Sequence, residues 1–397
     1  MKKLMIILVA LMVATTAGCS ASSSSDSGGG AGEVIKVATS TPLSGSQAAL
    51  GESIKNGAQM ALEERKAEFA ELGFNLQIAP QDDQADPKVG VSVAQKLIVD
   101  DDILAVVGHF NSGVAIPSSE VYAQKNLAMV SPANTAVAVT ERGLKNVNRI
   151  CIRDDAQGPA GADFAYNELG AKTGFVVHDK TTYGQGVADE WRNRYESIGG
   201  KLLGYEGITA GESDFSAVEE LIRAADPDIV FFGGIYPEGS LLIKQMNDKG
   251  IDVKFMGADG MDSAEVIKIA GASAIGIYYT SPAADINATP EGKAFADKYA
   301  AKFGKQAEAY SGYGYDAMNV TLNGLVKAIN DNGGKKPDRD QVTAAVRTIS
   351  GFKGVSTNVT FDEKGDNIDA AVYALTFEET KYPPAVVKKI PAGEYLK

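Results

Sequence analysis

Cysteine, histidine and tryptophan are scarce in this chain, whose 397 residues include two cysteines, two histidines and one tryptophan. Two cysteines exclude a disulfide framework and a cysteine-rich metal module, and two histidines argue against a histidine-based zinc site. Basic residues are outnumbered, with 38 Lys and Arg against 51 Asp and Glu and a net charge of −13. An acidic surface attracts neither nucleic acid nor anionic lipid. We therefore expect no metal, no cofactor and no nucleic-acid partner.

Long apolar runs are also missing after the N-terminus, where no stretch approaches the roughly 20 residues needed to span a bilayer. The one uninterrupted apolar stretch, residues 4–14, follows Lys2 and Lys3. A short apolar segment behind a positive start is typical of a secretory signal. We expect the protein to be exported after removal of residues 1–18.

The end of this signal resembles a bacterial lipobox, because the small residues Thr16, Ala17 and Gly18 precede Cys19. Thr16 departs from the usual leucine, and an ordinary signal peptide with an incidental cysteine is the alternative. Residues 19–33 are mostly Ser, Gly and Ala, the composition of a flexible tether. We expect Cys19 to be lipidated, so that the protein is periplasmic or at the cell surface, held at a membrane without spanning it.

The remainder, with 44% hydrophobic and 22% charged residues overall, alternates short β-branched runs with longer amphipathic stretches. This rhythm predicts βαβ units and parallel sheets, hence an α/β fold. Ten such strands are too many for one sheet with its helices, so two doubly wound lobes that divide near Arg153 are expected. The expected strands are residues 34–39, 74–80, 104–108, 127–130, 147–152, 174–177, 201–204, 229–232, 254–256 and 276–279. The expected helices are residues 48–71, 87–99, 114–124, 159–169, 187–198, 215–224 and 238–247.

The C-terminal part follows another rhythm. Three helices are expected without intervening strands, at residues 290–303, 310–330 and 341–350, and short strands at 358–361 and 371–377 come after them. This order suggests that the chain returns to the first lobe and then crosses again to the second.

Polar residues follow several of the expected strands, at the sheet edge where open α/β folds bind ligands. Ser112 opens a helix behind a glycine-containing turn, a position suited to a carboxylate. Residues 131–135 follow the next strand, and Asp259 follows a later one, where it suits an ammonium. Taken singly, a capping serine and a turn aspartate are simpler interpretations. Together these residues describe an α-amino acid held between the lobes.

A series of short motifs then carries a resemblance to a known family. In order, they are Asp86-Pro87-Lys88, Gly108-His109, Ser131-Pro132-Ala133, Gln157-Gly158-Pro159, His178-Asp179-Lys180, Tyr183-Gly184, residues 207–212, Asp214-Phe215-Ser216, Gly233-Gly234, Phe255-Met256-Gly257 and residues 361–366. From residue 34 to the C-terminus, the chain resembles the leucine-isoleucine-valine binding proteins of bacterial ABC importers. The resemblance implies a type I periplasmic-binding fold with two lobes and three hinge crossings, near Arg153, Ser281 and Asp362. It assigns residues 34–153 and 282–361 to lobe 1, and residues 154–281 and 362–397 to lobe 2.

The resemblance also implies the roles of five residues in the ligand site. Ser112 and the backbone N–H of Thr135 should hold the α-carboxylate. The Ala133 carbonyl and the Thr135 hydroxyl should accept from the ammonium. Asp259, where the family usually has glutamate, should pair with the ammonium from lobe 2, and Tyr183 should close over the ligand.

The side-chain pocket departs from the family type. Leu50 and Ile235 stand where the family has aromatic residues, with Tyr236 beside the latter, Phe110 replaces a smaller aliphatic residue, and Tyr310 replaces a phenylalanine. Ala85 and Asn111 occupy the two cysteine positions of the family's small disulfide, and Asn111 is counted with the ligand-binding residues. The head-group site is therefore expected to be kept, while the side-chain pocket is rebuilt.

The resemblance implies a monomeric binding protein, not an enzyme, that captures an aliphatic, branched-chain amino acid and passes it to a membrane permease. Three alternatives stay open at this point. The same fold could bind an aromatic carboxylate or a short amide, or it could report to a sensory receptor. The third is a hydrolase that uses Ser112 with His109 or His178, which the missing G-x-S-x-G motif argues against.

Overall fold

The computed structural model describes residues 32–395. The expected signal, lipobox and tether therefore lie outside the described residues, apart from residues 32 and 33. No helix within the described part of the chain combines the length and the apolar character that crossing a bilayer requires.

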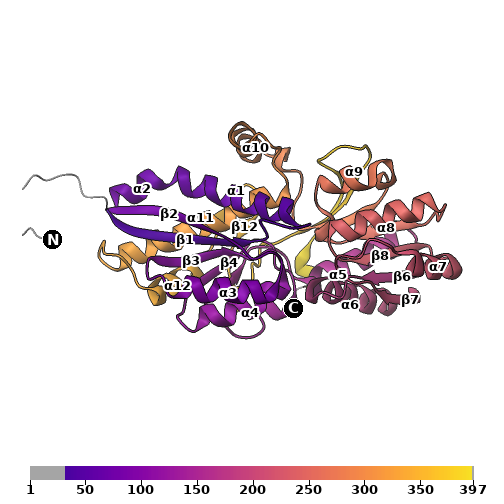
Figure 1. Ribbon diagram of the computed structural model, residues 1–397, viewed down its shortest axis with the longest axis horizontal. Helices are drawn as coiled ribbons and strands as arrows, with labels where there is room; N and C mark the ends of the chain where they lie inside the picture. Colours follow the sequence, from indigo (N-terminus) through magenta and orange to yellow (C-terminus); the bar gives the residue numbers. More distant parts are fainter. Residues whose placement is uncertain (1–31, 396–397) are drawn as a thin grey trace, which may run out of the picture. The chain divides into compact units, whose positions relative to one another are not determined.

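Two open sheets organise the chain (Figure 1). The first sheet is parallel throughout and has the order β2-β1-β3-β4-β5. Its strands are β1 (Glu33–Thr41), β2 (Phe74–Asp82), β3 (Ile103–Gly108), β4 (Ala128–Ser131) and β5 (Val147–Arg149).

Alternate residues of the first sheet face opposite helical layers, as the two-residue period of a strand requires. Ile35 and Val37 of β1 pack with α1, α11 and α12, whereas Ala38 packs with α3 and α4 on the other face (Figure 1). These helices are α1 (Ala48–Glu64), α3 (Pro87–Ile98), α4 (Ser112–Ala123), α11 (Ala309–Asp331) and α12 (Arg339–Arg347), with the short α2 (Lys66–Glu71) after α1. Burial on both faces explains why these strands are apolar almost throughout.

The second sheet has the order β14-β13-β10-β9-β8-β6-β7. β6 to β10 pair in parallel, whereas β13 and β14 join antiparallel at the β10 edge. The strands are β6 (Thr173–His178), β7 (Lys201–Gly207), β8 (Ile229–Gly233), β9 (Lys254–Gly257), β10 (Tyr278–Ser281), β13 (Val372–Thr376) and β14 (Ala385–Ile390). The accompanying helices are α5 (Asp154–Asp163), α6 (Thr182–Ser197), α7 (Ser216–Ala225), α8 (Tyr236–Asp248) and α9 (Glu265–Ala270).

The chain passes between the sheets three times. It leaves the first sheet after β5, returns after β10 through α10 (Pro290–Phe303), α11 and α12, and enters the second sheet again at β13. The small hairpin of β11 (Phe352–Lys353) and β12 (Asn358–Val359) precedes the last passage. The α/β class, the doubly wound sheets and the return of the chain are thus as predicted.

Several expected element boundaries were wrong. The helix expected over residues 48–71 is two helices, because the first ends at Glu64 and the second begins at Lys66. The helix expected from residue 159 begins at Asp154, and Pro159 lies inside it. A proline there removes only one intrahelical hydrogen bond, which the surrounding packing tolerates. The short α9 and the edge strand β14 were not predicted.

Candidate functional site

The carboxyl ends of strands from both sheets converge on one small cavity. The available volume, measured for the centre of a water molecule, is about 10 Å³, enough for roughly one water. It is lined by Phe110, Asn111, Ser112, Ala133, Tyr183, Ile235, Asp259 and Gly260. All but Gly260 are residues that the sequence predicts for the ligand site. Phe110 to Ser112 and Ala133 follow β3 and β4 of the first sheet, whereas the others follow β6, β8 and β9 of the second.

The loop after β3 is set by a close approach of two strands. A Cβ atom at Gly108 would lie 2.4 Å from the carbonyl oxygen of Ser40 in β1, so only glycine fits there. The chain then enters α4 at Ser112, whose Oγ accepts from the backbone N–H of Ala136 at 3.3 Å. The hydroxyl proton of Ser112 is therefore free to be donated to a ligand.

Asn134 joins the two loops of the first sheet, and sequence reasoning did not identify it. Its Nδ2 donates to the Phe110 carbonyl at 2.8 Å, and its Oδ1 accepts from the His109 N–H at 3.2 Å and from Ser131 Oγ at 2.7 Å. The side chain is fully buried. The sequence did offer a signal for Asn134, because it lies between Ala133 and Thr135, two residues that are expected to contact the ligand.

We expect Asn134→Ala to weaken ligand binding about tenfold, because the variant loses the buried hydrogen bonds that join the loops after β3 and β4. Calorimetric titration with the preferred amino acid measures this. Asn146→Ala is the matched control, since Asn146 is equally buried but donates to Leu127 before β4. Equal losses of affinity in both variants would contradict a positioning role for Asn134.

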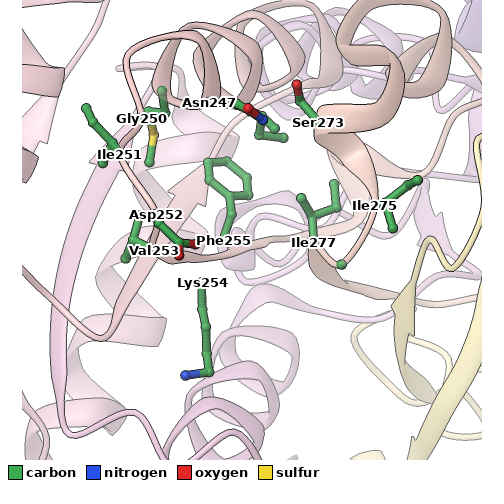
Figure 2. A pocket seen from close by; sticks show the side chains of 13 residues that line it. Asn247, Gly250, Ile251, Asp252, Val253, Lys254, Phe255, Ser273, Ile275 and Ile277 are labelled. Atoms are coloured by element: carbon green, nitrogen blue, oxygen red, sulfur yellow. The ribbon is translucent and has the colours of Figure 1, made fainter.

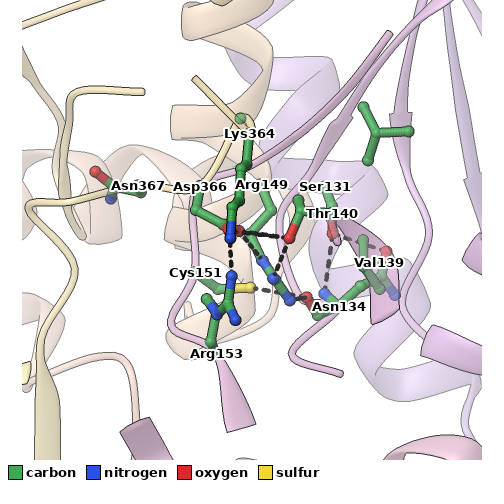
Figure 3. A network of polar contacts seen from close by, with 12 residues as sticks. Ser131, Asn134, Val139, Thr140, Arg149, Cys151, Arg153, Lys364, Asp366 and Asn367 are labelled. Atoms are coloured by element: carbon green, nitrogen blue, oxygen red, sulfur yellow. Dashed lines mark hydrogen bonds and ion pairs between the residues drawn. The ribbon is translucent and has the colours of Figure 1, made fainter. Parts of the chain in front are cut away.

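A buried arginine donates hydrogen bonds to the loop that follows β4 (Figure 3). Arg149 of β5 donates through Nη1 to the carbonyls of Asn134 and Ala136, at 3.0 and 2.8 Å. Its Nε pairs with Asp366 Oδ1 at 2.7 Å. Burial acts to raise the pKa of Asp366, but the charges of Arg149 and Arg153 hold it below its ordinary value. The loop of the first sheet is thus fastened to the last passage between the sheets.

Asp259 is the central charged group of the cavity. It opens a short 3-10 turn directly after β9 and is 3% exposed. Its Oδ2 accepts from the Tyr310 hydroxyl at 2.6 Å, and its Oδ1 accepts from the Tyr183 hydroxyl at 2.7 Å and from Gln157 Nε2 at 3.0 Å. Burial raises the pKa of this carboxyl, and the three neutral donors offset part of the rise. No Lys, Arg or His within residues 32–395 forms an ion pair with it.

A second buried carboxylate, Asp154, lies close by, and the sequence reasoning missed it. Asp154 is the first residue of α5 and is 1% exposed, and its backbone N–H donates to the Thr135 carbonyl at 2.9 Å. Neither carboxylate oxygen has a hydrogen-bond partner among the described residues. Burial, with the charge of Asp259, raises the pKa of this group well above its ordinary value, and the Thr135 hydroxyl and the charge of Arg149 offset part of the rise. The sequence did offer a signal for Asp154, because it directly follows Arg153, where the first passage between the lobes is expected.

The apolar side of the cavity includes Phe110 and Ile235, two of the residues that depart from the family pattern. Phe110 meets the edge of Tyr310, with ring centroids 5.4 Å apart and planes at 90°. Leu50, Ile235 and Tyr236 belong to the same cluster of buried apolar side chains, although Leu50 and Tyr236 do not line the cavity. Tyr236 turns its hydroxyl to the Ser46 carbonyl at 2.5 Å, and so links the two sheets' loops.

A wider hollow lies at the opposite edge of the second sheet, and none of the expected ligand residues lines it. Figure 2 shows Phe255 and Ile277 in it, near the starts of β9 and β10, with Asn247 and Ser273 as polar groups. Ligands of open α/β sheets bind at the carboxyl ends of the strands, so the cavity at Asp259 is the better candidate.

The two histidines are engaged away from Ser112. His109 is fully buried, with Nδ1 at 2.7 Å from Asp83 Oδ2 and Nε2 at 3.2 Å from the Tyr122 hydroxyl. His178 Nδ1 accepts from the Lys180 N–H at 3.2 Å. Neither ring is hydrogen-bonded to Ser112 in the described structure, so the geometry offers no support for the hydrolase alternative.

Known proteins match this chain over most of its length. The family model described as periplasmic binding protein matches residues 34–381. Leu/Ile/Val-binding protein homolog 2 of Brucella abortus is 40% identical over 333 residues, which cover 84% of this chain and 87% of the relative. A leucine-, isoleucine-, valine-, threonine- and alanine-binding protein of Pseudomonas aeruginosa is 35% identical, over 88% of this chain and 92% of the relative. Among solved structures, the substrate-binding protein LivJ of Streptococcus pneumoniae with isoleucine aligns with a TM-score of 0.81. It shares 25% identity, over 90% of this chain and 100% of that one.

Proposed function

Since the chain belongs to the periplasmic binding protein family, we propose that it is the extracytoplasmic receptor of an ABC importer for an aliphatic, branched-chain L-amino acid. The observation that carries this proposal is Asp259, a buried carboxylate with three neutral donors and no cationic partner among the described residues. Burying a carboxylate without a counter-charge is costly. A ligand ammonium supplies that charge.

The other half of the amino acid has its groups on the first sheet. The Ser112 hydroxyl and the backbone N–H of Thr135 hold the α-carboxylate, at the start of α4, where the helix dipole favours a negative charge. The Ala133 carbonyl and the Thr135 hydroxyl, which is buried without a partner in the described part of the chain, accept from the ammonium. Tyr183 covers the ligand from the second sheet.

Binding requires the walls of the cavity to part and close again. The cavity of about 10 Å³ is too small for an amino acid, and its walls come from both sheets. We assign residues 34–153 and 282–361 to lobe 1 and residues 154–281 and 362–397 to lobe 2, with hinges near Arg153, Ser281 and Asp362. Ligand binding shifts the protein toward the closed form because the closed form binds the ligand more tightly.

The remaining assignments follow from the export signal and the family. The protein is a monomer, anchored through Cys19 after removal of residues 1–18, and tethered by residues 19–33. It delivers its ligand to a membrane permease and catalyses no reaction.

Calorimetric titration of the mature protein, unfolded and refolded to remove bound ligand, tests the proposal. The panel holds leucine, isoleucine, valine, alanine and phenylalanine, with decarboxylated and deaminated leucine and benzoate. We expect micromolar or tighter binding of an aliphatic amino acid, lost with both analogues. Binding of benzoate or of the deaminated acid alone would replace this proposal by the aromatic-carboxylate alternative.

We expect Phe110→Leu to shift the preference toward larger side chains, because the ring fills the apolar side of the cavity against Tyr310. A pocket's discrimination between neighbouring side chains is about 1–3 kcal/mol, so the ratio of leucine to alanine affinity should rise about tenfold. The control is Phe303→Leu, which removes the same ring in a separate apolar cluster around α10. An equal change in that control would mean that Phe110 does not select the ligand.

A further inference from the structure

Asp154 is a buried acid that none of the roles above uses. It stands in α5 one turn before Gln157, the residue that donates to Asp259. On the neighbouring α6, Gly186 comes one turn after Tyr183, which also donates to Asp259. A Cβ at Gly186 would lie 3.7 Å from Asp154 Oδ2. The two acids are therefore flanked by the same pair of helices.

Several buried polar atoms around Asp154 have no hydrogen-bond partner within 3.5 Å in the described part of the chain. Both oxygens of Asp154, the hydroxyl of Thr135 and Oε1 of Gln157 are buried and have no hydrogen-bond partner among residues 32–395. Buried polar atoms are nearly always paired. The Asp154 oxygens and Gln157 Oε1 only accept, whereas the Thr135 hydroxyl can both accept and donate to the carboxylate. The unfilled acceptors suit a ligand with several N–H donors and a positive charge, such as a primary ammonium.

The charged groups that face Asp154 leave it without a cation of its own. Arg149 attracts it at a distance but directs its donors to Asp366, Thr140, Asn134 and Ala136. Arg153 donates to Asp155, Glu141 and Asp366. On the adjoining elements, Asp155 of α5 and Asp259 after β9 add negative charge. Tyr183 of α6 and Thr135 are neutral.

We propose that Asp154, which does not line the small closed cavity itself, is a second carboxylate for the ligand's ammonium in addition to Asp259, and that the pair releases a proton when the amino acid binds. This inference rests on the proposed function. Two carboxylates buried together hold one proton between them, as like charges at one site cannot both ionise cheaply. The incoming ammonium brings one positive charge, the shared proton leaves to the buffer, and the charge of the site stays at −1.

The directions of the pKa shifts agree with this exchange. Burial raises the pKa of both carboxyls, and the charge of Asp259 raises that of Asp154 further. Ligand binding must then become tighter as the pH rises, because protons compete with the ammonium. The affinity changes by up to about tenfold per pH unit while one full proton is released.

The test is calorimetric titration of the mature protein with leucine, in phosphate and in Tris at the same pH between about 7 and 8, with the affinity also followed from pH 5 to 8.5 in buffers suited to each pH. The difference in heat between the buffers counts the protons. We expect up to one proton released by the wild type. Asp154→Asn should release almost none, show a nearly flat pH profile and bind about tenfold more weakly at pH 8.5.

Asp155→Asn is the matched control, because it removes a charge from the next residue of α5, where Asp155 pairs with Arg153. If Asp154 served only the helix dipole, both variants would behave alike, and the inference would be wrong. Should Asp154→Asn fail to fold, the proton count of the wild type still decides, since no release over this pH range overturns the inference. If the wild type binds no amino acid at all, the proposed function itself is wrong. That result differs from amino-acid binding without proton release, which overturns only the inference about Asp154.

Discussion

Replacing Asp259 with asparagine is expected to weaken amino-acid binding by about 100-fold or more. The substitution keeps the shape of the side chain and removes the carboxylate to which Tyr183, Tyr310 and Gln157 donate. Removing one member of a buried charge pair costs about 2–5 kcal/mol of binding free energy. Calorimetric titration of both proteins with the preferred amino acid measures the loss.

The stability of the ligand-free protein should move in the opposite direction. Asp259 has no cationic partner among the described residues, so neutralising it relieves a desolvation cost. We expect an unchanged or higher Tm for Asp259→Asn without ligand, and a much smaller rise in Tm than in the wild type at the same concentration of the amino acid. The control is Glu265→Gln, since Glu265 pairs with Lys268 on α9. An unchanged affinity in Asp259→Asn would remove the ammonium assignment.

Replacing Arg149 with methionine is expected to lower the free energy of unfolding by about 3 kcal/mol or more. The guanidinium is fully buried, and its loss leaves Asp366 with one ion pair, to Arg153, and with the Thr140 hydroxyl as a neutral donor. It also takes a donor from Thr140 and from two backbone carbonyls. Breaking a buried pair from one side costs about 3–5 kcal/mol. Urea unfolding at pH 7 measures the change. Arg194→Met removes a half-exposed pair with Asp163 and should cost at most about 1 kcal/mol.

The same variant should change the response to acid. The pKa of Asp366 is held below its unfolded value, so its contribution to stability is present above the unfolded pKa. That contribution is lost as the pH falls through the folded pKa. Without Arg149 this contribution shrinks, and stability should fall less steeply with acid in the variant than in the wild type. If the stability of the variant and of the wild type fell equally steeply with acid, Arg153 alone would be enough to keep the pKa of Asp366 low.

Much of the fold could be predicted because its signals are local. The apolar runs of β3 and β8 are bounded by turn residues, and Asp86 with Pro87 marks the start of α3, where the aspartate accepts from the N–H groups of Lys88 and Val89. The break after Glu64 has no such signal, since the chain there remains helix-forming on both sides. β14 was missed because an exposed edge strand lacks the apolar run of a central one.

The residues that line the candidate cavity were predicted in part, for a related reason. Ser112, Ala133 and Asp259 stand at strand ends, which the strand pattern locates. Asn134 and Asp154 were not predicted because the sequence does not show hydrogen-bond partners: those of Asn134 are remote in the chain, and the Asp154 oxygens have none in the described structure. Asn134 links two loops across 24 residues, and Asp154 is notable for oxygens that find no donor in the described structure.

By itself, the sequence determined the order of strands and helices, the two doubly wound sheets and the strand ends that carry polar groups, because periodicity and turn chemistry act over a few residues. Only the tertiary structure decided which of those ends meet, and which acids are buried without a cation. Gln157 and Asp259 are 102 residues apart in the chain and 3.0 Å apart in space. Burial and charge pairing depend on such distant neighbours, and they set both the pKa of a carboxylate and what it can bind.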